Sequence, residues 1–147
     1  MTIEPEALVG QSLLEVTSSW HEHHGKRSPD PVHLWLSVSQ LGTLRLHTAG
    51  DGSLEIAVAQ PYDPYDMKES GRVTVERIAP ESLRKWLGQR IGAVSTPRQD
   101  PPGMKVGLVL YFHHGSVGLA NLGDEFVIHA WPATTWEHWD VAVDSPV

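Results

Sequence analysis

The sequence of 147 residues contains no cysteine. This absence excludes disulfide bonds, thiolate nucleophiles and cysteine-based zinc sites, and it fits a reducing compartment. There is also no apolar run of about 18 residues, the length that a transmembrane helix needs. Residues 1–6 are acidic and interrupted by Pro5, which is not the pattern of a signal peptide. We therefore expect a cytoplasmic protein with no membrane partner.

Basic residues are scarce, with 11 Lys and Arg against 18 Asp and Glu and a formal net charge of −7. Nucleic-acid binding depends on Lys and Arg gathered on one surface, and the densest basic stretch is only Arg84, Lys85 and Arg90. We expect no nucleic-acid partner. An acidic surface would favour a basic protein partner, although moderate acidity commonly serves solubility alone.

Catalytic sequence motifs are missing as well. There is no Gly-x-Ser-x-Gly elbow, no glycine-rich phosphate loop and no His-Glu-x-x-His metal motif. The sequence therefore does not predict an enzyme, and we expect no cofactor.

The most informative positive feature is an internal repeat. Residues 5–13 and 80–91 both begin with Pro-Glu, pass through leucines and reach Gly-Gln, followed by a short apolar alternation. Proline at the first helical position and glycine just past the end are typical helix boundaries. Each repeat is therefore expected to open with a short helix, the second with an apolar face of Leu83, Trp86 and Leu87.

The agreement continues through strand-like runs separated by glycine turns at Gly42 and Gly115 and by Gly-Asp pairs. The matching runs are 32–38 and 106–112, 44–46 and 117–119, 54–56 and 126–128, and 72–78 and 136–143. The pattern predicts a mainly β fold of two pseudo-repeated antiparallel β-meander units, with about ten short strands and one or two short helices, sandwich- or barrel-like. We expect a single domain, 1–147, made of repeats at about 4–78 and 79–145.

The segment between the third and last strands of the first repeat is rich in tyrosine and aspartate. Tyr62, Asp63, Tyr65 and Asp66 combine rigid contact area with negative charge, a combination suited to a basic partner surface. The alternative is a proline-rich turn whose tyrosines pack back on the sheet, and the sequence leaves both open. Trp136 and Trp139 stand three apart on a predicted strand and face opposite sides, so one is a second candidate for partner binding.

Histidines form the third candidate site. His21 and His23 alternate, so on a strand both point the same way and could hold Zn²⁺ or Ni²⁺ with one more ligand. The candidates for that ligand are His113, His114, His129 and His138. The favoured alternative is a solvated polar segment before Gly25, so no metal is expected.

One stretch resembles a known group of proteins. Residues 108–128, with the Gly115 turn and the run Asn-Leu-Gly-Asp-Glu-Phe at 121–126, resemble the strand, turn, N-x-GDEL, strand pattern of small uncharacterised actinobacterial proteins. Some of these proteins resemble immunity proteins that protect bacteria against polymorphic toxins. Residues 8–11, Leu-Val-Gly-Gln, are also similar to the sequences of this group. The resemblance implies a protein-binding role, but its motifs describe turns, so it identifies no inhibitory residue.

The leading hypothesis is a non-enzymatic protein-binding module, an immunity-type inhibitor or an accessory partner of another bacterial protein. The alternative is a metal- or small-ligand-binding β protein, an enzyme included, that uses His21 and His23. A third interpretation is a structural subunit that forms a homodimer through an exposed sheet edge.

Overall fold

The computed structural model describes residues 2–99, 103–122, 125–131, 141–143 and 146–147. These residues form fourteen antiparallel strands, the 3-10 helices η1 (Pro5–Leu8) and η2 (Lys68–Ser70), and the short α-helix α1 (Glu81–Arg84). The predicted mainly β class is confirmed, with more strands than expected because several have only two or three residues. The strands of the first repeat are β1 (Leu13–His23), β2 (Lys26–Arg27), β3 (His33–Val38), β4 (Gly42–Thr48), β5 (Leu54–Val58), β6 (Tyr65–Asp66) and β7 (Arg72–Glu76). Those of the second repeat are β8 (Ala93–Ser95), β9 (Pro97–Gln99), β10 (Met104–Lys105), β11 (Gly107–Phe112), β12 (Gly115–Leu122), β13 (Glu125–Ala130) and β14 (Val141–Val143).

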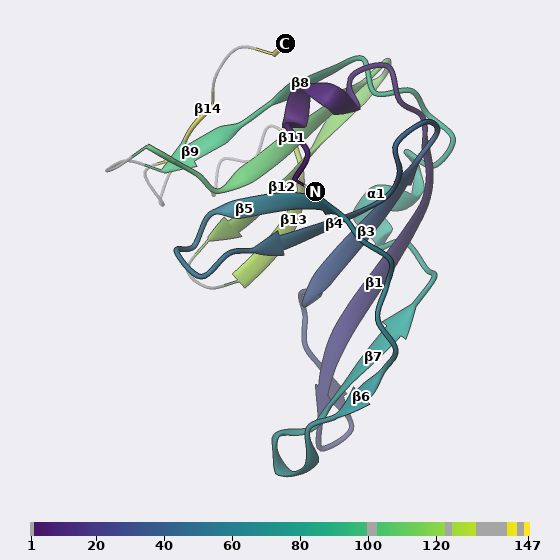
Figure 1. Ribbon diagram of the computed structural model, residues 1–147, viewed down its shortest axis with the longest axis vertical. Helices are drawn as coiled ribbons and strands as arrows, with labels where there is room; N and C mark the ends of the chain where they lie inside the picture. The colour runs from purple at the N-terminus through teal and green to yellow at the C-terminus, as the bar shows by residue number, and fades with distance from the viewer. Residues whose placement is uncertain (1, 100–102, 123–124, 132–140, 144–145) are drawn as a thin grey trace.

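The two repeats have the same strand order. The first sheet runs β5-β4-β3-β1-β7-β6, with β2 paired to β1. The second repeat forms the ladder β13-β12-β11-β8, and β9, which follows β8 after Thr96, pairs with β10 and β14. The consecutive strands β8 and β9 together take the place that β1 has in the first sheet. The strand order of the second repeat is then β13-β12-β11-β8/β9-β14, and that of the first is β5-β4-β3-β1-β7 (Figure 1). The predicted pair of antiparallel meanders is therefore confirmed.

The register is also repeated, which assigns equivalent positions residue by residue. Leu34 pairs with Leu46 in the first sheet, and Leu108 pairs with Leu119 in the second. One strand further out, Leu46 pairs with Ile56 and Leu119 with Ile128. Ile56 and Ile128 are therefore equivalent positions of the two edge strands.

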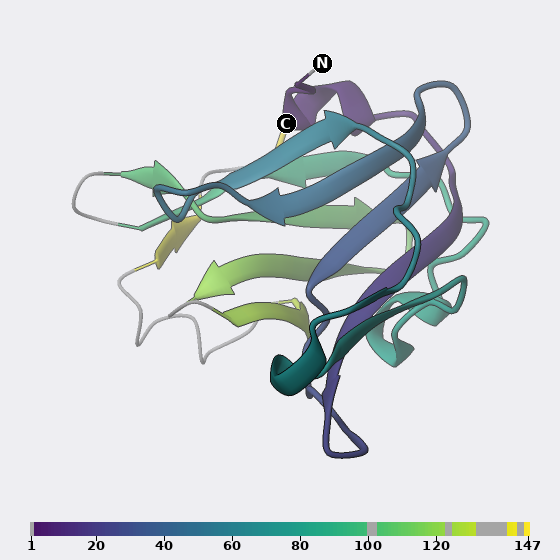
Figure 2. The same cartoon turned by 60° about the horizontal axis from the view of Figure 1, so that its bottom comes forward.

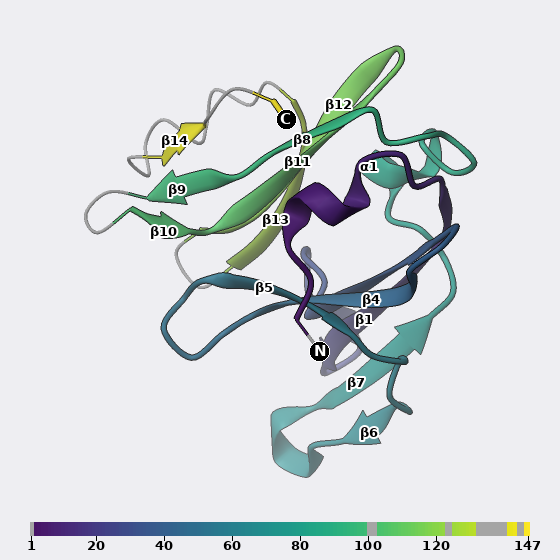
Figure 3. The same ribbon diagram turned by 45° about the horizontal axis from the view of Figure 1, so that its top comes forward.

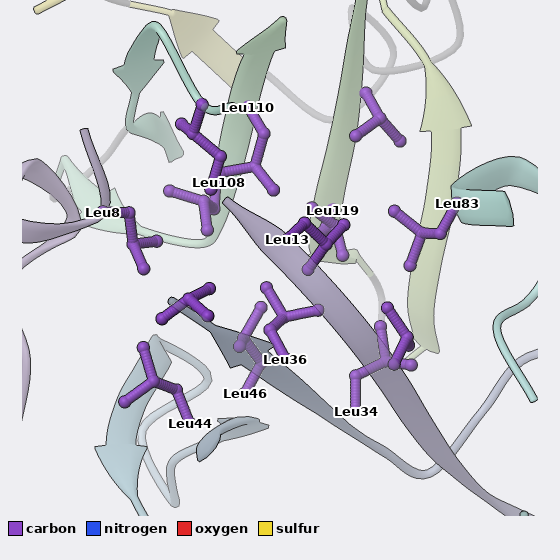
Figure 4. Packing of buried hydrophobic residues seen from close by; sticks show 14 of the residues in the cluster. Leu8, Leu13, Leu34, Leu36, Leu44, Leu46, Leu83, Leu108, Leu110 and Leu119 are labelled. Carbon is purple, nitrogen blue, oxygen red and sulfur yellow. The ribbon is translucent and has the colours of Figure 1, made fainter. Parts of the chain in front are cut away.

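The two sheets face each other around one shared core, and the arrangement is a sandwich of open sheets (Figures 2 and 3). Alternate residues of each strand point inward, as the pleat of a strand requires. Leucines from both sheets meet in the middle, and Leu8 and Leu83 of the two short helices join the same cluster (Figure 4). Burying each such leucine contributes roughly 2 kcal/mol, so the shared core holds the repeats together.

Strand β1 is longer than its counterparts in the second repeat. It has 11 residues, whereas β8 and β9 have three each. The second half of β1 pairs with β2 and β7, and β6 adds to β7. Together these strands form an arm that extends beyond the second sheet (Figure 1).

The predicted opening helices are shorter than the sequence pattern suggests. The helix α1 ends at Arg84; of the expected apolar face, Leu83 and Trp86 are buried, whereas Leu87 is 38% exposed. Only residues 141–143 of the predicted last strand lie within the described part of the chain, as β14. Within that same part, no helix has the length and apolar character needed to cross a membrane.

Candidate functional site

The two repeats agree on their inner faces and differ on their outer faces. On the outer face of β3 and β4 lie His33, Trp35, Arg45 and His47. The equivalent positions of β11 and β12 hold two glycines, a valine and an alanine: Gly107, Val109, Gly118 and Ala120. Polar and aromatic side chains at these positions are therefore not shared by the two repeats. We call His33, Trp35, Arg45 and His47, with Ser19 and Tyr62, the outer-face cluster.

Tyr62 joins the loop after β5 to this cluster. Its hydroxyl donates to Ser19 Oγ at 2.8 Å and lies 2.7 Å from His33 Nδ1. Its ring meets Trp35 edge to face, with centroids 5.0 Å apart. Of the two predicted arrangements, Tyr62 thus adopts the one that packs back on the sheet.

The rest of the predicted binding segment faces solvent. Tyr65 is 46% exposed and contacts Tyr62, with ring centroids 5.5 Å apart. Asp63 and Asp66 are exposed, and Asp66 Oδ1 accepts a hydrogen bond from the Lys68 backbone at 2.7 Å. Because Tyr65 and Asp66 form β6 against β7, the segment Tyr62–Asp66 is a partly stranded ridge on the surface.

Burial and a neighbouring cation keep the two imidazoles of the cluster uncharged. Desolvation lowers the pKa of His33 to about 4, with Arg45 and His47 adding to the shift. Desolvation also lowers the pKa of His47, and the positive charge of Arg45 lowers it further. The Glu55 carboxylate, 3.7 Å from His47 Nε2, acts in the opposite direction and raises this pKa. At neutral pH the cluster therefore carries neutral histidines around one guanidinium.

Several buried polar atoms of the cluster have no hydrogen-bond partner among the described residues. They are Trp35 Nε1, Arg45 Nε and His47 Nδ1, and Trp35 is fully buried. Leaving a buried donor or acceptor unpaired costs about 1–3 kcal/mol. In the second sheet the equivalent Val109 and Ala120 belong instead to a second buried hydrophobic cluster.

His21 and His23 lie at the end of β1 and share one side, as predicted, with ring centroids 6.3 Å apart. Their Nε2 atoms lie 2.6 Å from the Ser70 carbonyl and 3.0 Å from the Glu69 carbonyl. Across the described part of the chain, no group of three or more His, Asp or Glu side chains is placed to hold a metal ion.

The proposed third metal ligands lie elsewhere in the fold. His113 and His114 form the exposed turn between β11 and β12, and His129 is on β13. His138, like the predicted binding residues Trp136 and Trp139, falls outside the described residues. The described structure brings none of the three placed histidines to His21 and His23.

The inner face of the arm carries a group of side chains that sequence reasoning missed. Arg27 stacks over Trp20 at 5.2 Å from the ring centroid and forms an ion pair with Glu76. These three residues line a pocket of about 340 Å³ beside α1. The alternation of residue types around Trp20 and the His-Leu-Trp run of β3 could have indicated strands with a polar or aromatic outer face. Neither pattern identifies a site, because the neighbouring side chains come from partner strands whose register the sequence does not give.

Comparisons with protein-family models, with characterised proteins and with solved structures give no match for this chain. The candidate site therefore rests on the geometry of the chain and on the comparison between its two repeats.

Proposed function

We propose that the chain is a protein-binding module whose recognition surface is the ridge Tyr62–Asp66 over the outer-face cluster. The observation that carries the proposal is the difference between the repeats. The same scaffold positions hold small apolar residues in the second sheet and costly buried polar residues in the first. A buried polar cluster on one sheet only, which contacts the exposed Tyr65 through Tyr62 and lies beside the exposed Asp63 and Asp66 in the sequence, is typical of a recognition surface.

The chemistry of the cluster favours binding over catalysis. Ser19 is fully buried, and its Oγ accepts hydrogen bonds from both Tyr62 and the His33 backbone. It is therefore poorly placed to attack a substrate. An imidazole with a pKa of about 4 is also a weak general base at neutral pH.

The charge of the surface suggests the kind of partner. Asp63 and Asp66 are exposed, and the whole chain carries a net charge of −7. Complementary charge speeds and orients association, so the partner is a protein with a basic contact surface. Together with the resemblance to immunity-type proteins, this leads us to an inhibitor or accessory partner of another bacterial protein, such as a basic toxin in the cytoplasm.

The test is co-purification with a tag that contains no histidine, followed by cross-linking mass spectrometry. The variant Asp63→Ala/Tyr65→Ala/Asp66→Ala removes the exposed part of the ridge. Leu14→Ala/Glu6→Ala/Glu15→Ala is the matched control, because it also removes one exposed large side chain and two exposed carboxylates.

We expect one stoichiometric partner, an affinity about tenfold to a hundredfold lower in the ridge variant, and no change in the control. Equal affinity of both variants would remove the ridge as the interface. A clean eluate with no stoichiometric partner would count against the protein-binding function itself.

A further inference from the structure

Arg45 lies in the outer-face cluster between an aromatic and a methyl side chain. It pairs across the strands with Trp35 on β3 and with Ala57 on β5. Neither neighbour can neutralise a guanidinium, because the indole is uncharged and alanine ends in a methyl group. Among the described residues, Arg45 forms no ion pair and no hydrogen bond through its half-buried side chain.

The rings around Arg45 carry no negative charge at neutral pH. His33 and His47 follow on the same two strands, with ring centroids 6.2 Å apart, and burial and then the charge of Arg45 lower the pKa of both. The phenol of Tyr62 is also uncharged, since burial raises its pKa. The carboxylate of Glu55 lies 3.7 Å from His47 Nε2 and forms no ion pair with Arg45. The charge of Arg45 is therefore left without a counter-charge in this half-buried place.

The unpaired buried nitrogen atoms of the cluster match one kind of ligand. Trp35 Nε1 and Arg45 Nε can only donate a hydrogen bond, and His47 Nδ1 can donate in one tautomer. Buried N–H groups without a partner commonly mark a place that a water molecule or an ion completes. All three atoms are satisfied by an acceptor. Of the Arg45 nitrogens, Nε alone is among these buried atoms, so a ligand first reaches the Nη1 and Nη2 end of the guanidinium.

The charge balance of the cluster favours a carboxylate over a phosphate. One guanidinium compensates one negative charge, and its planar fork matches the two oxygens of a carboxylate. A phosphate group, with about two negative charges, would need a second cation, and the neutral His33 and His47 provide none. The Glu55 carboxylate beside His47 would also repel the additional charge.

We propose that Arg45 binds a carboxylate side chain, of Glu or Asp, on the partner protein. This inference rests on the proposed function, because ring contacts of 5.5 Å and 5.0 Å lead from Tyr65 through Tyr62 to Trp35 and so join the ridge to the cluster. The partner's contact surface then carries an acidic residue for Arg45, surrounded by basic residues for the two exposed aspartates of the ridge. An entirely basic surface would meet Arg45 with like charge, which lowers affinity.

The test examines the binding site first and the source of the carboxylate second. Propionate, the side-chain analogue of glutamate, is titrated into the isotope-labelled full chain at pH 7 and constant ionic strength. Two-dimensional NMR follows the Trp35 indole and Arg45 guanidinium N–H signals. Propionamide is the matched neutral probe, and inorganic phosphate is the anion of higher charge. In the protein, Arg45→Gln removes the proposed contact, and Arg77→Gln is the matched control at an exposed arginine outside the cluster.

We expect saturable shifts with a dissociation constant of about 1–10 mM for propionate, weaker binding of phosphate and none of propionamide. Arg45→Gln should weaken propionate binding at least about tenfold, and Arg77→Gln should leave it unchanged. If Arg45→Gln does not fold, the Arg45 and Trp35 signals of the unaltered chain still decide. Absence of saturable shifts at these two groups, or equal binding of propionamide, would overturn the site. Tighter binding of phosphate would overturn the carboxylate assignment.

The same two variants identify the source of the carboxylate. In the co-purification test, Arg45→Gln should lower the affinity for the partner about tenfold, and Arg77→Gln should not change it. Unchanged affinity of Arg45→Gln, with propionate bound at Arg45, would mean that a free carboxylate occupies the site and would overturn the partner assignment. A clean eluate with no partner would overturn that assignment as well. The propionate titration needs no partner, so failure of the site and failure of the proposed function are distinguishable.

Discussion

Ser12 and Arg90 face each other across an antiparallel bridge, and they occupy the same position of the two repeats. The backbone bonds around them are reciprocal. They run from Gly10 N to Ile91 O at 2.8 Å, from Gly88 N to Leu13 O at 2.6 Å, from Leu13 N to Gln89 O at 2.9 Å and from Ile91 N to Gln11 O at 2.8 Å. An approximate two-fold axis therefore passes between Ser12 and Arg90, and the repeated Gly-Gln motif is the place where the repeats join.

This junction predicts equal sensitivity at equivalent core positions. Leu13 and Ile91 flank the axis and are both fully buried. Leu13→Ala and Ile91→Ala should each lower the free energy of unfolding by about 3 kcal/mol, because each leaves a cavity in the shared core. Urea unfolding followed by tryptophan fluorescence measures this. Leu14→Ala, at a 57% exposed neighbour, should cost less than about 0.5 kcal/mol. A large loss in only one half would argue against a shared core.

The hydroxyl of Tyr62 should matter more for stability than that of Tyr65. Tyr62→Phe removes the bond to the fully buried Ser19 Oγ and the contact with Nδ1 of the half-buried His33. We expect a loss of about 1–2 kcal/mol in the free energy of unfolding. Tyr65→Phe, at a 46% exposed side chain, is the control and should be nearly neutral. Equal effects of the two changes would mean that the hydrogen-bonded chain does not hold the loop to the sheet.

The stability of the protein should fall as the pH falls from about 6.5 to about 4. The pKa of His33 is lowered to about 4 by burial, so within this window the unfolded chain binds a proton that the folded chain does not. The contribution of His33 to the free energy of unfolding is fully present at pH values above its pKa in the unfolded chain. It is lost progressively as the pH falls toward its pKa in the folded protein. His47, whose pKa is also lowered, acts in the same direction.

Thermal unfolding at several pH values, with NMR titration of the His33 ring, tests this dependence. His33→Gln should flatten the decline between pH 6.5 and pH 4 without removing it, because His47 remains. A His33 ring that titrates near pH 6.5 in the folded protein would contradict the burial of the cluster.

Gly71 should be intolerant of a side chain. It has a φ of 97°, and a Cβ there would lie 2.2 Å from the Glu22 carbonyl oxygen of the neighbouring strand. Gly71→Ala should cost at least about 2 kcal/mol and disorder the pairing of β6 with β7. Gly25→Ala is the control, since Gly25 has a φ of 75° but nothing within 4 Å, so it should cost only about 1 kcal/mol. Circular dichroism during urea unfolding compares the two.

The fold was predictable because the core positions repeat. Leucines at alternate positions of β3 and β4 and their counterparts in β11 and β12 indicate strands with one buried face, and the glycine turns separate them. The candidate site was predictable only in part. The ridge residues Tyr62 and Tyr65 stood out by composition, whereas Arg45 and His47 did not, because their side chains become neighbours of His33 only through the pairing of β3 with β4.

The positions of the strands along the chain and their alternating inward faces were determined by the sequence itself, since periodicity and turn residues act locally along the chain. The tertiary structure alone decided which outer face gathers polar side chains and which sheet edge the N-terminal residues close. Ile3 and Ile78 show the reason: their sequence surroundings are nearly the same, yet one is 8% and the other 56% exposed. The difference arises because the chain before Ile78 is already paired in β7, a constraint between distant segments that no local pattern contains.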